Sequence, residues 1–215
     1  MPPSIYFGGC AFGAAFYVGV YRALADMYGD EFYKDTLICG DSGGSIFAVG
    51  VSLGFDTEEL YGMYMRICTS TRESNHSFYD PSAKAGASVF LAKELWWLLS
   101  EPTAFQTLNG NCMVGTTYYE NKHVWHKEWR DNIEVFHSVM GSCHIPIYCA
   151  PNKRVLGQHV VDGAFSISGE HLPHGDETLF VGISKMADVY RTLTREQMLQ
   201  PPDAKQFADM EQVSV

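Results

Sequence analysis

The stretch Gly40-Asp-Ser-Gly-Gly44 lies between an apolar run at residues 36–39 and a second apolar run at residues 46–53. These flanks predict a strand, a tight turn and a helix. Small residues around Ser42 permit the strained turn that lifts a serine hydroxyl clear of a sheet. The amides at the start of the following helix then point toward that hydroxyl and stabilise negative charge. The pattern favours a nucleophilic Ser42 over a surface serine in a glycine-rich turn.

The rest of the chain alternates between strand and helix patterns. Residues 4–7 predict a strand that runs into Gly8-Gly9, and residues 14–27 predict a helix after it. Asp56 and Glu59 form a capping-box pattern at the start of a helix over residues 57–68. We further expect a loop at 69–80, helices at 82–100 and 131–142, and strands at 112–114, 155–156, 159–161 and 178–183, the strands at 155–156 and 159–161 being paired. This alternation predicts an α/β fold.

Composition sets the size of the domain and argues against one class of partner. The 215 residues, 46% of them hydrophobic, suffice for one compact domain, expected at residues 1–191 with a C-terminal helix and tail at 192–215. The net charge of −10 and the lack of basic clusters argue against nucleic acid. The same acidity disfavours docking on anionic membranes, so contact with lipid would rest on apolar or aromatic side chains.

Two further features bear on the compartment. The sequence has no apolar run of 18 residues, and its start lacks the basic and apolar segments of a secretory signal. We therefore expect a cytoplasmic protein. The six cysteines have no CxxC spacing and stand mostly in apolar surroundings, which predicts reduced, packed thiols. The sequence holds no indication of the oligomeric state.

Asp162 is the strongest candidate for the base that Ser42 requires. It ends the apolar run at residues 159–161 and precedes Gly163, which places a carboxylate at the end of a strand, where a sheet exposes its functional groups. A turn-forming Asp-Gly pair is the alternative interpretation. Histidine is the more usual base for a serine nucleophile. None of the histidines stands in a diagnostic context, including His144, His159, His171 and His174.

The spacing His123-x-x-His126 raises the question of a metal site. On one face of a helix the two imidazoles could ligate a metal, but no carboxylate or thiolate partner stands at a matching spacing. An exposed amphipathic helix is the expected structure of this segment. We expect no metal and no cofactor.

Three segments in order resemble the patatin-like phospholipase family. They are Phe7-Gly-Gly-Cys-Ala-Phe-Gly13 with Val18-Gly-Val20 beyond it, Gly40-Asp-Ser-Gly-Gly44, and Val161-Asp-Gly-Ala164. The glycine-rich segment looks most similar to the triacylglycerol lipase and adiponutrin branch of that family. The resemblance implies a three-layer α/β/α hydrolase domain with a mostly parallel central sheet.

The resemblance also implies roles for individual residues. Ser42 would be the nucleophile and Asp162 the base of a Ser-Asp dyad. The oxyanion hole would be formed by the backbone amides of Gly9, Cys10, Ala11 and Gly43. Glycines that support the three motifs are Gly8, Gly13, Gly40, Gly44 and Gly163. The implied reaction is hydrolysis of carboxylic ester bonds in phospholipids or acylglycerols through an acyl-enzyme, at a membrane or lipid-droplet surface touched only peripherally.

The glycine-rich loop departs from the family's GxGxxG pattern. In the register that also aligns Val18-Gly-Val20, the three glycine positions fall on Gly9, Ala11 and Ala14, and a shifted register places Cys10 and Gly13 at glycine positions instead. Alanine still supplies an amide but restricts positive φ. Two alternatives to a hydrolase therefore stand beside it. One is a lipid acyltransferase, and the other is a catalytically silent lipid-binding or regulatory member of the fold.

Overall fold

A computed structural model describes residues 1–73, 86–118, 120–145, 154–155, 157–183 and 205. Its α-helices and strands run in the order β1 (Ser4–Phe7), α1 (Ala15–Tyr28), β2 (Leu37–Asp41), α2 (Gly43–Ser52), α3 (Thr57–Glu73), α4 (Gly86–Leu98), α5 (Ala104–Leu108), β3 (Cys112–Tyr118), β4 (Lys122–His126), α6 (Asn132–Ser142), β5 (Arg154–Val155), β6 (Gln158–Asp162) and β7 (Thr178–Val181). Short 3-10 helices are η1 (Phe32–Asp35), η2 (Gly163–Phe165), η3 (Gly169–His171) and η4 (Gly175–Glu177).

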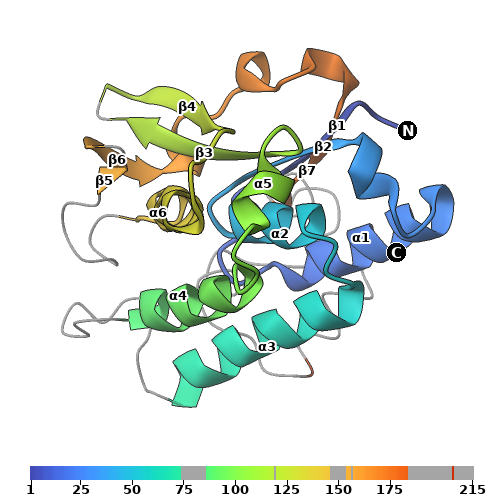
Figure 1. Ribbon diagram of the computed structural model, residues 1–215, viewed down its shortest axis with the longest axis horizontal. Coiled ribbons are helices and arrows are strands. Elements are labelled where there is room, and N and C mark those ends of the chain that lie inside the picture. The colour runs from blue at the N-terminus through green and yellow to red at the C-terminus, as the bar shows by residue number, and fades with distance from the viewer. Residues whose placement is uncertain (74–85, 119, 146–153, 156, 184–204, 206–215) are drawn as a thin grey trace.

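The strands form one mixed sheet in the order β5-β6-β3-β2-β1-β7, with β4 paired to β3 (Figure 1). Strands β7, β1, β2 and β3 run parallel to one another. Strands β4 and β6 are antiparallel to β3, and β5 is antiparallel to β6. The resemblance to patatin-like proteins implied a parallel centre, and parallel strands of this kind are covered on both faces. The antiparallel edge adds the strand pairing that proves important for the site.

Helical segments cover both faces of the sheet, which confirms the three-layer α/β/α architecture. On one face, α1, α2, α3, α4 and α6 enclose the main core, whose largest buried side chains include Phe7, Tyr17, Phe47 and Leu60. On the other face, Tyr6, Cys39 and Met113 form a smaller cluster covered by Trp125 and by Ile167 and Leu172 of the η2–η4 segment. The candidate catalytic residues lie at strand ends, Ser42 directly after β2 and Asp162 at the end of β6.

Most of the expected elements are present, with two corrections. Strands β5 and β6 pair as expected. Helix α3 continues to Glu73, so the expected loop at residues 69–80 is wrong over its first five residues. The histidine pair His123-x-x-His126 lies on β4 and both rings are buried, so the expectation of an exposed helix is wrong. Val124 and Trp125, which stand between the two histidines, are residues that favour a strand. Strand β4 pairs with β3 from Lys122 to His126.

Several expectations fall partly or wholly outside the described residues. They are the rest of the loop at 74–80, the start of the helix at 82–85, the last residue of the strand at 155–156, and, but for residue 205, the helix and tail at 192–215. The cysteines at positions 10, 39, 68, 112 and 143 form no disulfide, as expected, and Cys149 lies outside the described ranges. Among the helices that the structure describes, none is both long and apolar enough to cross a membrane.

We predict that Asp56→Ala lowers the free energy of unfolding by about 1 kcal/mol in a denaturant titration. The Asp56 side chain accepts a hydrogen bond from the Glu59 amide at 2.8 Å, and the Glu59 side chain accepts one from the Asp56 amide at 2.9 Å, which is the capping box expected from the sequence. The control is Glu58→Gln, which alters only an exposed ion pair with Arg22 and should change stability by less than about 0.5 kcal/mol. Equal effects of the two variants would contradict a stabilising cap.

Candidate active site

Ser42 sits in a sharp turn between β2 and α2. Its backbone has φ 54° and ψ −132°, a conformation that non-glycine residues rarely adopt. Gly44 makes the turn possible, because a methyl group on its Cα would lie 2.2 Å from the carbonyl oxygen of Phe7. Gly40 is constrained in the same way, since a methyl group there would lie 2.3 Å from the Gly44 carbonyl oxygen. This is the strained strand-to-helix turn that the sequence predicted.

Hydrogen bonds from three neighbouring residues hold this turn. The amide of Ser42 donates to the Ser142 hydroxyl at 2.8 Å, and the Ser45 hydroxyl donates to the Ser42 carbonyl at 2.6 Å. The Tyr64 hydroxyl donates to the Gly43 carbonyl at 2.8 Å. Because these partners come from α6, α2 and α3, packing of three helices positions the serine.

Asp162 reaches the same place from another strand. Strand β3 pairs with β4 along one edge, while β2 and β6 share its opposite edge. Strand β2 ends with Asp41 opposite Gly115, and antiparallel β6 ends with Asp162 opposite Thr116. The two strand ends therefore meet at successive positions of β3, and this brings Ser42 and Asp162 together. The amide of Asp162 is fixed by donating to the His144 carbonyl at 2.8 Å.

The Asp162 carboxyl is buried and has one oxygen available. Its Oδ1 accepts a hydrogen bond from the Ala164 amide at 2.9 Å, whereas Oδ2 has no partner of ordinary geometry among the described residues. Burial raises the pKa of Asp162 to about 6, opposed by the interaction with Ser42 and by the Ala164 amide. Ser42 is thus close enough to act on the carboxyl, although no hydrogen bond of standard geometry joins them. The free Oδ2 can accept a proton.

The loop after β1 lies against the Ser42 turn. A methyl group on Gly9 would lie 2.8 Å from the Ala164 Cβ and 3.4 Å from the Ser42 Cβ. A methyl group on Gly43 would lie 2.6 Å from the Cys10 sulfur and 3.5 Å from the Ala11 nitrogen. The structure therefore brings together all four residues expected at the oxyanion hole. In the part of the chain that the structure describes, the amides of Gly9, Cys10 and Ala11 donate to no protein acceptor.

The two alanines at glycine positions of the loop differ in conformation. Ala11 has φ 47°, the left-handed region in which glycine is favoured, whereas Ala14 has φ −64° and begins α1 with ordinary helical geometry. A methyl group on Gly13 would lie 3.1 Å from the Cys10 carbonyl oxygen and 2.3 Å from the end of the Ile183 side chain, which would have to move. Of the two alanines, only Ala11 therefore holds a backbone conformation that favours glycine.

Three of the histidines have side-chain partners away from Ser42. His159 lies 2.8 Å from the Arg154 guanidinium, and His171 lies 2.8 Å from the Ser168 hydroxyl. His126 lies 2.8 Å from the Thr116 hydroxyl, and burial lowers its pKa to about 4. No cluster of three His, Cys, Asp or Glu side chains suited to a metal ion occurs among the described residues.

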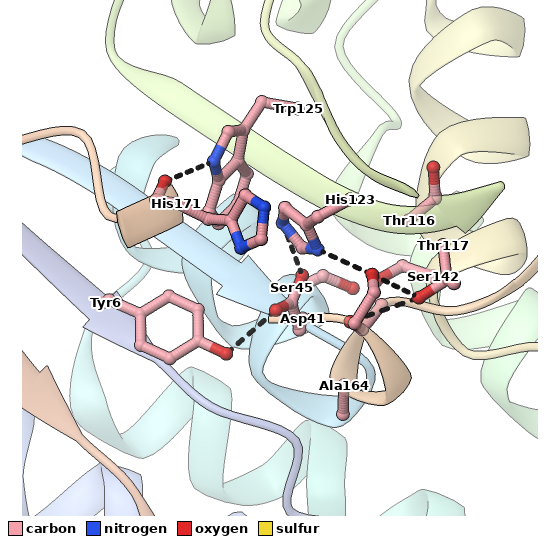
Figure 2. Close-up of polar contacts among 12 residues, drawn as sticks. Tyr6, Asp41, Ser45, Thr116, Thr117, His123, Trp125, Ser142, Ala164 and His171 are labelled. Atoms are coloured by element: carbon pink, nitrogen blue, oxygen red, sulfur yellow. Dashed lines mark hydrogen bonds and ion pairs between the residues drawn. The ribbon is translucent and has the colours of Figure 1, made fainter. Parts of the chain in front are cut away.

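Sequence reasoning missed a buried polar cluster behind the nucleophile, formed by Tyr6, Asp41 and His123 (Figure 2). The Tyr6 hydroxyl donates to Asp41 Oδ2 at 2.8 Å, and His123 Nε2 lies 3.8 Å from Asp41 Oδ1. Burial raises the pKa of Asp41 to about 7 and lowers that of His123 to about 4. The signal that could have revealed it is an acidic residue at the end of an apolar strand, directly before the serine.

Comparison with known proteins gives the following matches. A family model described as patatin-like phospholipase matches residues 5–169, more than half of the chain. The human protein 1-acylglycerol-3-phosphate O-acyltransferase PNPLA3 is 26% identical over 191 residues, covering 87% of this chain and 38% of that protein. The mouse omega-hydroxyceramide transacylase is 24% identical over 170 residues, covering 77% of this chain and 27% of that protein. The chain therefore spans less than two fifths of the length of either curated relative.

One solved structure also resembles the chain. VipD from Legionella pneumophila matches with a TM-score of 0.45 and 15% sequence identity. The match covers 83% of this chain and 49% of VipD.

The conformations of Ala11 and Ala14 lead to a test with a built-in control. We predict that Ala14→Gly lowers the free energy of unfolding by about 1 kcal/mol, since it removes a fully buried methyl group from the N-cap residue of α1, whose φ needs no glycine. Ala11→Gly should leave it unchanged or raise it by up to about 1 kcal/mol, because glycine relieves the left-handed conformation. The measurement is urea unfolding of both variants beside the wild type. A greater loss for Ala11→Gly than for Ala14→Gly would contradict the described loop.

Proposed function

This chain belongs to the patatin-like phospholipase family, and from that premise we propose that it hydrolyses carboxylic esters of phospholipids or acylglycerols, with Ser42 as nucleophile and Asp162 as base. The observation that supports this most strongly is the meeting of β2 and β6 on one edge of β3. At that meeting point, a strained, buried serine lies beside a buried carboxyl whose Oδ2 is unpartnered in the described chain. Such a pair is what nucleophilic catalysis requires.

In the first half of the proposed reaction, the Ser42 Oγ attacks the ester carbonyl carbon while its proton passes to Asp162 Oδ2. The carbonyl oxygen becomes an oxyanion, which the amides of Gly9, Cys10, Ala11 and Gly43 stabilise together with the start of α2. The tetrahedral intermediate then collapses. The bond to the alcohol breaks, the alcohol takes the proton from Asp162, and the acyl group stays on Ser42.

The second half repeats these steps with water. Asp162 accepts a proton from a water molecule as its oxygen attacks the acyl carbon, and a second tetrahedral intermediate forms. Collapse of this intermediate releases the fatty acid and returns the proton to Ser42. Ester and water are converted to alcohol and acid, with no change of oxidation state.

The environment of Asp162 suits this role. A solvent-exposed aspartate has a pKa near 4 and binds protons weakly at neutral pH. Burial raises the pKa of Asp162 to about 6, so the group is still ionised at pH 7 and accepts a proton more readily. We place the lipid substrate at a membrane or lipid-droplet surface, and the acidity of the whole chain leads us to expect contact with that surface through apolar side chains.

A second candidate function has a specific observation in its favour. Both curated relatives are named for acyl transfer, one as an O-acyltransferase and the other as a transacylase. The first half of the reaction is the same for a transferase, since the acyl group is also held on Ser42. A lipid hydroxyl then replaces water as the acceptor. The proposal of a hydrolase rests on the dyad alone, which serves either acceptor.

We predict that Ser42→Ala and Asp162→Asn each lower the hydrolysis of a short-chain p-nitrophenyl ester by about 10³-fold or more. Ser42→Ala should also abolish labelling by a fluorophosphonate probe, since that probe bonds to the nucleophilic oxygen. The matched controls are Ser100→Ala, just after α4, and Asp176→Asn, on η4, the same chemical changes at exposed positions. An unlabelled wild type without esterase activity would refute the proposal. Full activity of Asp162→Asn would refute the dyad.

The choice between water and a lipid acceptor can be tested by product analysis. We predict that the wild type, given a phospholipid or triacylglycerol in mixed micelles, releases free fatty acid as its main product. Addition of lysolipid or glycerol as a competing acceptor should divert less than about a tenth of the acyl groups. Mass spectrometry of both products measures the partition, with Ser42→Ala as the blank. A product mixture dominated by newly acylated acceptor would identify a transferase.

A further inference from the structure

The buried carboxyl of Asp41 lies close to Ser42 but has no part in the proposed reaction. Asp41 is the last residue of β2 and directly precedes Ser42, yet its side chain lies on the face of the sheet opposite α2, beside Tyr6 (Figure 2). It is completely buried. A buried carboxyl costs free energy unless its oxygens have partners. The arrangement of its neighbours therefore needs an explanation.

The space that Asp41 occupies depends on two glycines, Gly115 within β3 and Gly163 at the start of η2. A methyl group on Gly115 of β3 would lie 1.8 Å from Asp41 Oδ1, and one on Gly163 would lie 2.5 Å from the same oxygen. The carboxyl thus rests against the backbone of Gly163, the residue that follows Asp162. Any displacement of Asp41 would press on the turn that orients the proposed base.

The ionisable groups facing Asp41 come from several elements. Within the described residues they are Tyr6 of β1, His123 of β4 and Asp162 of β6, with the His171 ring of η3 lying beyond His123 at a centroid distance of 5.2 Å. The low pKa of His123 means that a neutral imidazole faces the carboxyl at neutral pH. Asp41 Oδ1 and His123 Nε2 are both buried without a hydrogen bond. The only negative neighbour in this set at that pH is Asp162.

A hydrogen-bonded chain continues from His123 to the backbone of Asp162. His123 Nδ1 lies 3.2 Å from the Ser166 hydroxyl, which lies 2.7 Å from the Thr117 hydroxyl. The Thr117 hydroxyl donates to the Asp162 carbonyl at 2.8 Å. Together with the contact at Gly163, this chain links Asp41 to both ends of the short turn after β6.

We propose that Asp41 is a positioning residue for Asp162, acting in two ways. Held between Tyr6 and His123, its carboxyl fixes the turn that follows Asp162. Its charge also couples to that of the Asp162 carboxyl, because two like charges in a buried site disfavour each other's ionisation. This inference rests on the proposed function, in which Asp162 is the base.

The main test is Asp41→Asn, which keeps the size of the side chain and an acceptor for Tyr6 but removes the ionisation. We expect kcat for a soluble ester to fall about 10-fold with KM within about 2-fold, since the orientation of the base is altered rather than binding. Asp41 has the higher pKa, about 7 against about 6, so it is mostly neutral while Asp162 ionises, and the acidic limb of the kcat profile should stay in place. Asp26→Asn, the same change at an exposed site on α1, is the control.

A readout that needs no turnover separates this inference from the proposed function. The Asp41 carboxyl is titrated by carbon-13 NMR, with Asp41→Asn used to assign its signal, and its midpoint should fall in Asp162→Asn, which removes the negative charge that faces it. An unchanged midpoint overturns the coupling even if the enzyme is active. A lowered midpoint in a protein whose Ser42 is not labelled by fluorophosphonate supports the coupling while the proposed function fails.

If Asp41→Asn does not fold, Tyr6→Phe tests the role of Asp41 instead. It removes only the hydroxyl that donates to Asp41, and we expect kcat to fall about 3-fold with KM unchanged. Thermal unfolding monitored by circular dichroism shows which variants are folded. Normal kcat in the folded variants would overturn the proposal.

Discussion

The close approach of the start of α2 to the end of β1 is the constraint on which the rest of the site depends. Gly44 packs so tightly on the carbonyls of Phe7 and Gly8 that a methyl group on its Cα would lie 2.2 and 2.4 Å from them. Helix α2 can therefore begin immediately after β2 only if Ser42 takes up the whole change of direction, which explains its unusual φ and ψ. The same approach brings the loop after β1 against Ser42.

The direction of β6 is the second requirement. This strand pairs with β3 at Thr116–Tyr118, just beyond the positions that pair with β2. Because β6 runs antiparallel to β3, its last residue lies opposite Thr116, next to the end of β2. A parallel strand in the same place would carry its last residue to the far end of this pairing, two positions away, or roughly 7 Å. A mixed sheet is thus what joins the serine and the carboxylate.

Sequence patterns predicted the parts of this site that depend on local geometry. The Ser42 turn, the strand ending at Asp162 and the capped α3 follow from glycines, apolar runs and a capping box, all of which act over a few residues. The His123-x-x-His126 segment was misassigned because its burial depends on pairing with β3, a contact between strands that residue spacing does not encode. Asp41 escaped notice for the same reason, since the space it occupies is made by Gly115 and Gly163.

The alanines of the oxyanion loop show a different limit of the sequence. Comparison with the family pattern treats Ala11 and Ala14 as equivalent losses of glycine, yet only Ala11 has a backbone that favours glycine. The residue type at a position does not reveal which backbone conformation the fold requires there, whereas the φ angle does. The amides that would bind an oxyanion belong to the backbone, so the loop keeps its proposed function as long as Ala11 holds its strained conformation.

The two buried carboxyls beside Ser42 affect the stability of the fold as well as the proposed chemistry. The pKa values of Asp41 and Asp162 are both raised, to about 7 and about 6, above those of exposed aspartates. Each contributes stability below pH 4, and this contribution is lost as pH rises through 6 and 7 and the buried groups ionise. At neutral pH the two groups therefore stabilise the fold less than they do at pH 4. Such a loss, placed at a strained serine, is typical of groups retained for chemistry rather than for folding.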